Sequence, residues 1–269
     1  MIRIDRELCV GCGRCAWDCF PGAITLEETA VLSQPDACIG CGHCVAVCPV
    51  SAVCADDLPG DDIIPCRNDV APEDLLTLMR SRRSCRHYRS EPVPEDTLSR
   101  LLSAARACPT AKNLQATRYI AVRENIPALL DLALEVLGEA GIRQLESASA
   151  PDEKRRAGNF IRWREMRRQD PAFDPLFFHA PALLLFVSPK ETAHDAAGAA
   201  AYTELMAASM GLGCLYSGYF TACAAMSPAI RDMLGVGDGE RVVRCLVLGY
   251  PDVSYPRTAP RKPPEVTYL

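Results

Sequence analysis

The carboxy-terminal part of the chain, about 200 residues, contains apolar positions that recur at helical spacing. Across Pro94–Ala107, three leucines and an alanine fall on one face, and the same spacing recurs over Ile126–Leu137, where Gly138 is expected to end the helix. Carboxylates in the first turn after Pro72 complement the helix dipole, which predicts a further helix over Pro72–Arg80. Three helices are therefore expected before residue 140.

Two continuous apolar runs have the length and boundaries of buried strands. They are Ala182–Ser188 and Arg241–Leu248. Between them, Asp195–Met210 is predicted to be a helix rich in small residues, which would allow close approach of a neighbouring helix. Ser227 is expected to cap a last helix that ends at Leu234. The order of elements predicts an α+β fold, with a sheet covered by helices.

The first fifty residues have a different organisation, because a 29-residue repeat contains eight of the fifteen cysteines. Each copy has the spacing C-x2-C-x2-C-x3-C, which is the spacing of the bacterial two-cluster ferredoxins. Pro49 directly follows the fourth cysteine of the second copy, whereas Phe20 precedes Pro21 in the first. The cysteines are Cys9, Cys12, Cys15, Cys19, Cys38, Cys41, Cys44 and Cys48.

This repeat predicts a module that holds two [4Fe–4S] clusters. The first three cysteines of a copy can wrap one cluster, while the fourth begins a helix and reaches the other cluster. One expected ligand set is thus Cys9, Cys12, Cys15 and Cys48, and the other is Cys38, Cys41, Cys44 and Cys19. A zinc site or a disulfide framework is the alternative, but crowded C-x2-C triplets suit neither.

Length, breakers and charge divide the chain into parts. We expect a ferredoxin-type domain over residues 1–56, a linker rich in proline, glycine and aspartate over 57–72, and a second domain over 73–269. The net charge of −5 resides in the first 60 residues, with three arginines against eight carboxylates, which disfavours nucleic acid as a partner. No leader and no membrane-spanning run is recognised, so a cytoplasmic protein with reduced thiols is expected.

Arginines cluster where the second domain begins. Arg82, Arg83 and Arg86 lie within five residues and have Ser84 among them. Guanidinium groups bind phosphate through paired, charge-assisted hydrogen bonds, so this segment could hold a phosphate group. Taken alone, Arg82 and Arg83 could equally form a solvated surface.

Five ordered motifs resemble the nitroreductase superfamily of FMN enzymes over roughly residues 75 to 269. The whole chain therefore resembles a nitroreductase fused to a ferredoxin. The motifs are Arg82-Arg83-Ser84-Cys85-Arg86-His87-Tyr88, Pro109-Thr110-Ala111-Lys112-Asn113-Leu114-Gln115, Gly211-Leu212-Gly213, Leu248-Gly249-Tyr250-Pro251 and Arg261-Lys262-Pro263.

The resemblance implies an FMN site and a homodimer. The ribityl phosphate would be held by Arg82, Arg83, Ser84, Arg86 and Arg261. The flavin would be lined by Thr110, Asn113 and Gln115, and backbone N–H groups near Ser217 and Gly218 would contact its ring edge. Gln115-Ala116-Thr117 departs from the Gln-Pro-Trp that is common in the family, and the tail Gly249–Leu269 resembles an arm that embraces a partner subunit.

Together, the cysteine repeat and the family resemblance predict an FMN-dependent oxidoreductase. Two [4Fe–4S] clusters are expected to pass single electrons to FMN, which would reduce a nitroaromatic, quinone or related conjugated acceptor by two electrons. An external donor is required, either reduced ferredoxin or NAD(P)H. The alternatives are an electron-transfer or redox-sensing protein without turnover of its own, and a flavoenzyme of dehalogenation or flavin breakdown.

Other candidate chemistry is weak. The four histidines are isolated, no protein nucleophile is predicted, and Cys85 is expected to pack between phosphate ligands. No G-x-G-x-x-G motif follows a strand. The basic segment Lys154–Arg168, which includes Trp163, could be a lid, a docking face or an exposed helix.

Overall fold

A computed structural model describes residues 2–56 and 63–269 of the chain. The described residues form two compact units, which we treat separately. The first contains the residues up to Asp69 together with Thr110–Leu114, and the second contains Val70–Pro109 and Gln115–Leu269. Residues 57–62 of the predicted linker lie outside the described residues.

The first unit is built from two short hairpin-like pairs of strands and two short helices. Strand β1 (Ile2–Ile4) pairs antiparallel with β4 (Val53–Ala55), and β2 (Ile24–Leu26) pairs antiparallel with β3 (Ala30–Leu32). The helices are α1 (Arg14–Trp17) and α2 (His43–Val47), and a 3-10 turn, η1, covers Pro35–Ala37. Each helix begins just before the third cysteine of a repeat, so the duplication in sequence is a duplication in structure. The prediction that the fourth cysteine begins a helix is wrong: α1 ends at Trp17, before Cys19, and Cys48 is the C-cap of α2.

The second unit contains a four-stranded antiparallel sheet in the order β5-β6-β8-β7. Its strands are β5 (Arg118–Val122), β6 (Ala182–Pro189), β7 (Gly213–Tyr216) and β8 (Glu240–Gly249). Strands β6 and β8 are central and are almost entirely buried, as the apolar runs predicted, because helices cover both of their faces.

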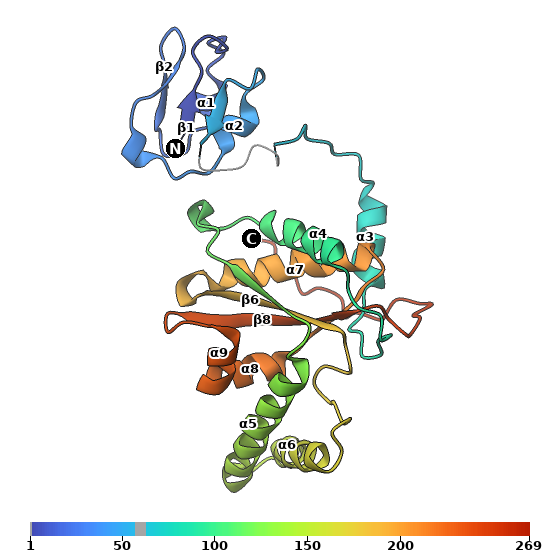
Figure 1. Cartoon of the computed structure of the whole chain (residues 1–269). Helices are drawn as coiled ribbons and strands as arrows, with labels where there is room; N and C mark the ends of the chain where they lie inside the picture. Colours follow the sequence, from blue (N-terminus) through green and yellow to red (C-terminus); the bar gives the residue numbers. More distant parts are fainter. Residues whose placement is uncertain (1, 57–62) are drawn as a thin grey trace. The chain divides into compact units, whose positions relative to one another are not determined.

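Helices lie on both faces of the sheet (Figure 1), and alternate side chains of its strands enter two separate cores. Leu183 and Leu185 of β6 face a core formed with α5 (Ile126–Ser147), α6 (Pro151–Gln169), α8 (Gly218–Met226) and α9 (Pro228–Leu234). Leu184 and Phe186 face a second core formed with α4 (Glu95–Arg106) and α7 (Ala193–Ser209). The expected α+β fold is therefore confirmed, with three layers. The remaining elements are α3 (Pro72–Ser81), η3 (Ala111–Asn113) and η4 (Lys190–Thr192).

Most predicted elements agree with the structure to within two residues. The cap of the last helix is confirmed, since the Ser227 hydroxyl accepts a hydrogen bond from the Ile230 backbone N–H at 3.3 Å. The predicted end of a helix at Gly138 is wrong, because α5 continues to Ser147. Gly138 and Gly141 instead make room for α6: a Cβ atom at Gly141 would lie 2.7 Å from the carbonyl oxygen of Ala157.

Four elements had no predicted counterpart or only an ambiguous one. Strands β5 and β7 were not predicted, and neither was α8, while the segment of α6 was only one of several readings. Strand β5 is a five-residue edge strand with a single fully buried side chain, which gives little periodic signal. Among the described residues, no helix is both long and apolar enough to span a bilayer.

Candidate functional site

The cysteine loops of the first unit have the same backbone conformation in both copies. Gly11 and Gly13 have φ of 64° and 70°, and Gly40 and Gly42 have φ of 63° and 76°. Glycine adopts this left-handed region without steric cost, and it lets the chain curl so that three consecutive cysteines turn to one side. A side chain at Gly11 would also collide with the carbonyl oxygen of Glu28, 2.7 Å from the ideal Cβ position.

The repeat cysteines form much of the core of this unit. Cys15 and Cys44 are buried, and Cys9, Cys19, Cys38 and Cys48 pack around them. Backbone N–H groups point at two of the sulfurs: Ala30 donates to Cys9 Sγ at 3.5 Å and Ala52 donates to Cys48 Sγ at 3.2 Å. Donation from Ala30 and Gly11 lowers the pKa of the Cys9 thiol, whereas burial raises that of Cys44 to about 11.

This arrangement fits a cluster better than a single metal ion or a disulfide. All fifteen cysteines are described, and every one is a free thiol. Within the described residues, no three His, Cys, Asp or Glu side chains converge closely enough to hold one ion. In a cubane each cysteine binds a different iron, so the sulfurs need not converge on one point.

In the second unit, the arginine segment lies against the end of β7. Ser84 and Cys214 form a parallel bridge, and the Cys85 N–H donates to the Cys214 carbonyl at 2.9 Å. Cys85 is buried, as expected, and packs so tightly that a Cβ atom at Gly213 would lie 2.7 Å from its Cβ and 2.8 Å from its Sγ. The Tyr88 hydroxyl donates to the Cys85 carbonyl at 2.9 Å and fixes the other side of the segment.

Arg82 and Arg83 line a cavity of about 190 Å³ together with Gly211, Gly213 and tail residues such as Tyr255. Arg82 is not free in this cavity, because its guanidinium donates to Glu204 of α7 at 2.5 Å. Sequence reasoning missed Glu204, although a carboxylate in an alanine-rich helix is itself a signal that a cation lies nearby. Burial, and secondarily Glu204, raises the pKa of the neighbouring Tyr216 hydroxyl well above its ordinary value.

Arg86 lines a second and larger cavity of about 630 Å³. Ser217 and Gly218, the two residues predicted at the ring edge of the flavin, line the same cavity. Within the described part of the chain, neither Arg83 nor Arg86 has a hydrogen-bond or ion-pair partner. The arginine segment thus presents two unpaired cations, each lining a separate cavity.

Besides Ser84, which bridges to Cys214 of β7, four predicted site residues line neither cavity. Thr110 and Asn113 belong to the first unit, where the Asn113 amide donates to the Gly40 carbonyl at 2.8 Å. Gln115 begins the chain's return to the second unit and has a left-handed φ of 47°. Arg261 lies in the exposed carboxy-terminal tail. The roles of these four residues stay predictions.

The basic segment forms part of helix α6, and two of its arginines form ion pairs with α5. Arg167 donates to Asp131 at 2.7 Å, and Arg168 donates to both oxygens of Glu135 at 2.9 and 2.8 Å. Trp163 of the same helix lines the 630 Å³ cavity. The segment is therefore partly a structural helix and partly a cavity wall.

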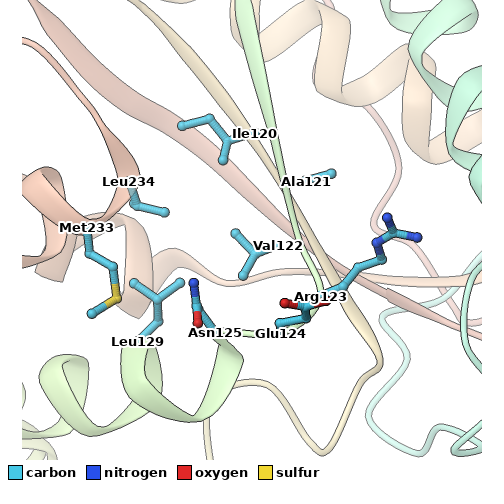
Figure 2. Close-up of a pocket in the computed structure, with 9 residues that line it drawn as sticks. All are labelled: Ile120, Ala121, Val122, Arg123, Glu124, Asn125, Leu129, Met233 and Leu234. Carbon is cyan, nitrogen blue, oxygen red and sulfur yellow. The ribbon is translucent and has the colours of Figure 1, made fainter.

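A third cavity, of about 310 Å³, lies where β5 meets α5 and α9 (Figure 2). Its lining is mostly apolar, with Ile120, Val122, Leu129 and Leu234 among the side chains drawn in the figure. No predicted site residue contributes to it, so it is not the candidate site.

The cysteine module and the cation-lined sheet domain together define a redox enzyme. Residues 79–250 match the nitroreductase family, and residues 1–49 match a 4Fe-4S dicluster domain. The chain belongs to the nitroreductase family and is an oxidoreductase with an amino-terminal iron–sulfur domain. The predicted family resemblance is thereby confirmed.

Solved structures show the same fold for the second unit. A nitroreductase with bound FMN from Bacteroides fragilis aligns with a TM-score of 0.56 and 20% identity, covering 73% of this chain and 98% of that one. An FMN-dependent nitroreductase from Clostridium difficile aligns with a TM-score of 0.55 and 17% identity, covering 74% and 100%. A Thermus thermophilus protein named NADH dehydrogenase is 41% identical over 78 residues, which span 29% of this chain and 35% of that relative.

Proposed function

We propose that the chain binds FMN along the arginine segment and two [4Fe–4S] clusters in the cysteine module, and reduces a conjugated acceptor such as a nitroaromatic or quinone. When bound, the clusters would supply single electrons and FMN would supply two-electron transfer to the acceptor. One observation carries this proposal. Within the described residues, Arg83 and Arg86 have no charged partner, lie on the same segment beside β7, and line two different cavities.

The smaller cavity suits a phosphate group. Arg83 offers an unpaired guanidinium, and Arg82 is held in place by Glu204; Ser84, the next residue, does not line this cavity. Gly211 has a φ of 77°, a conformation in which backbone N–H groups can turn toward an anion. The volume of about 190 Å³ is too small for a tricyclic ring, so the ring would lie elsewhere.

The larger cavity suits the flavin ring and the acceptor. At about 630 Å³ it is within the range of small-molecule sites. Arg86 would place a positive charge beside the ring edge, where negative charge develops on reduction, and the first turn of α8 would present N–H groups near Ser217 and Gly218. No side chain is assigned as a proton donor, since solvent can supply protons.

Two features support a homodimer, which the family resemblance also implies. Helix α3 has no buried residue, and its apolar face (Leu75, Leu76 and Met79) is 41–43% exposed in the single chain. The tail after Gly249 contains Val266 and Tyr268, which are 58% and 91% exposed. Apolar surface of this extent is typical of a surface that a second subunit covers.

The cofactor part of the proposal is tested by substitution at Arg83. Loss of a charge-assisted hydrogen bond to phosphate costs about 1.5–3 kcal/mol, so Arg83→Gln should weaken FMN binding by about 10- to 150-fold. Arg80→Gln removes an exposed arginine of α3 and serves as the matched control. Equal FMN dissociation constants for both variants and the parent would contradict the assigned site.

The electron route is tested by anaerobic reduction, with cluster and flavin absorbance followed separately. The name of the Thermus relative makes NADH the first donor to test, and reduced ferredoxin the second. In a variant with Cys9→Ser and Cys38→Ser, reduction of FMN should slow at least tenfold if the clusters are the entry route. An unchanged rate with NADH would show that the clusters are not obligatory. Consumption of nitrobenzene would favour an enzyme over a simple electron relay.

A further inference from the structure

Four aromatic side chains line the 630 Å³ cavity: Tyr216 of β7, and three that come from outside the sheet. Trp163 comes from α6, Phe178 from the loop before β6, and Tyr219 from the first turn of α8. We call these residues the aromatic wall. None of them belongs to the motifs that pointed to flavin binding, so the wall needs a separate explanation.

The rings of the wall are held by contacts with one another and with the core. Trp163 and Tyr219 meet edge to face, with centroids 5.9 Å apart and planes at 72°. Phe160, which is buried, contacts both rings with centroid distances of 5.8 and 5.2 Å. Such pairs stabilise ring orientation, so Trp163 and Tyr219 are ordered although Tyr219 is 44% exposed.

Phe178 reaches the cavity through a strained backbone. Phe178 and His179 have φ of 56° and 57°, a region that residues with a Cβ atom rarely adopt. The Asp174 carboxylate holds this conformation, since one oxygen accepts hydrogen bonds from the N–H groups of Leu176 and Phe177 at 3.1 and 2.8 Å, and the other accepts from His179 at 2.8 Å. Strain of this kind persists where the surroundings impose it, often beside a functional site.

The lining of the cavity carries charge of one sign. Among the lining residues, all of which the structure describes, Arg86 is the single charged side chain and carboxylates are absent. The faces of aromatic rings carry partial negative charge, so they favour the face or edge of an electron-poor ring. A cationic acceptor would meet Arg86 without any carboxylate to compensate.

We propose that the aromatic wall binds the acceptor and selects planar, electron-poor aromatic compounds that are neutral or anionic, with Asp174 as the positioning residue for Phe178. This inference rests on the proposed function, because it assumes that bound FMN shares the cavity. It goes further by assigning the residues that choose the acceptor. In the reaction, two electrons from the reduced protein and two protons from solvent convert a nitro group to a nitroso group and water.

The test follows reoxidation of the protein, so that no physiological donor is needed. Protein with its FMN content measured is reduced anaerobically with a stoichiometric amount of dithionite and mixed with nitrobenzene or with ferricyanide. Ferricyanide accepts electrons without a shaped pocket. Tyr219→Ala should raise the apparent dissociation constant for nitrobenzene about 2- to 10-fold, the effect of losing one aromatic contact, and this effect should be larger than any change in the rate with ferricyanide.

Tyr202→Ala is the matched control, because Tyr202 is also 44% exposed but lies on α7, which packs on the opposite face of the sheet. It should change neither rate. Trp163→Leu should weaken nitrobenzene binding as Tyr219→Ala does. If both wall variants bind FMN fully and oxidise with nitrobenzene at the parent's rate and affinity, the inference is overturned while the proposed function stands. A chain that binds no FMN would overturn both.

The role of Asp174 is tested by a double-mutant cycle. Asp174→Ala and Phe178→Ala should each weaken nitrobenzene binding, and the double variant should be no weaker than the Phe178→Ala variant, because both act through the same ring. Asp174→Asn retains an oxygen that can accept from Leu176 and Phe177 and should restore part of the affinity. Additive effects of the two alanine substitutions would refute the positioning role.

Discussion

Gly213→Ala should damage both the stability of the second unit and its capacity to bind FMN. An ideal Cβ atom at position 213 would lie 2.7 Å from Cys85 Cβ and 2.8 Å from Cys85 Sγ. Carbon atoms prefer separations of about 3.5–4.0 Å, so the arginine segment would have to retreat from β7 by about 0.8 Å or more. That shift would stretch the 2.9 Å hydrogen bond from the Cys85 N–H to the Cys214 carbonyl.

The cost combines two terms. Overpacking of a well-packed core costs about 1–3 kcal/mol, and loss of one backbone hydrogen bond costs about 1 kcal/mol. We therefore expect the free energy of unfolding to fall by about 2–4 kcal/mol. Arg83 and Ser84 move with the segment, so FMN should bind at least tenfold more weakly than to the parent, even under conditions where the variant is folded.

Urea unfolding and a fluorescence titration with FMN measure the two effects. Gly158→Ala is the control, because this glycine lies on α6 with nothing within 4 Å of its ideal Cβ, and alanine there should stabilise the helix by up to about 1 kcal/mol. Adding Cys85→Gly to Gly213→Ala removes the clashing atoms and should recover part of the affinity. The reasoning fails if Gly213→Ala unfolds at the parent's urea concentration and binds FMN equally well.

Three further outcomes are expected. In the native protein the buried Cys223 thiol, whose pKa burial raises to about 12, should resist alkylation while the exposed Cys66 reacts, as judged by peptide mass spectrometry; equal labelling would contradict this. The Arg118 guanidinium holds the pKa of Glu240 below its ordinary value, so Glu240→Gln should lower the free energy of unfolding at pH 7 by less than about 1 kcal/mol. The difference should decline as the pH falls through the lowered pKa of Glu240 and vanish where this carboxylate is protonated; a difference that persists there would exclude the ion pair as its source. Gly141→Ala should lower the melting temperature because its Cβ meets a backbone oxygen, and an unchanged melting temperature would mean that α5 and α6 can separate freely.

Sequence periodicity correctly predicted the elements of the second unit in which burial follows directly from the position of a residue along the strand or helix. The two central strands lie between two layers of helices, so their runs are apolar except for Ser188, Arg241 and Arg244, and both strands were recognised. Gly138 was misread because a glycine that ends a helix and one that admits a neighbouring helix look the same in a single sequence. Only the packing of α6, a long-range feature, separates the two cases.

The parts of the candidate site that depend on the spacing of neighbouring residues were predictable from the sequence. The cysteine repeat and the arginine segment are local motifs, and the structure places Arg82, Arg83 and Arg86 at cavities. Glu204 contacts Arg82, which is distant in the chain, and Asp174 acts by holding a backbone turn. Neither contact can be predicted from the spacing of residues in the sequence. A carboxylate within the alanine-rich helix α7, as Glu204 is, was the available clue.

The ion pair between Arg82 and Glu204 has a consequence for how salt should affect the protein. The three guanidinium groups of the arginine segment and this one carboxylate carry a net charge of +2. A phosphate monoester at neutral pH has about −1.5 to −2 charges, so the arginine segment, counted over both of its cavities, is nearly neutral once FMN is bound. Added salt should therefore weaken the binding of a phosphorylated cofactor to the empty site. Once the cofactor is bound, little net charge remains, so salt should have little effect on the binding of a second ligand.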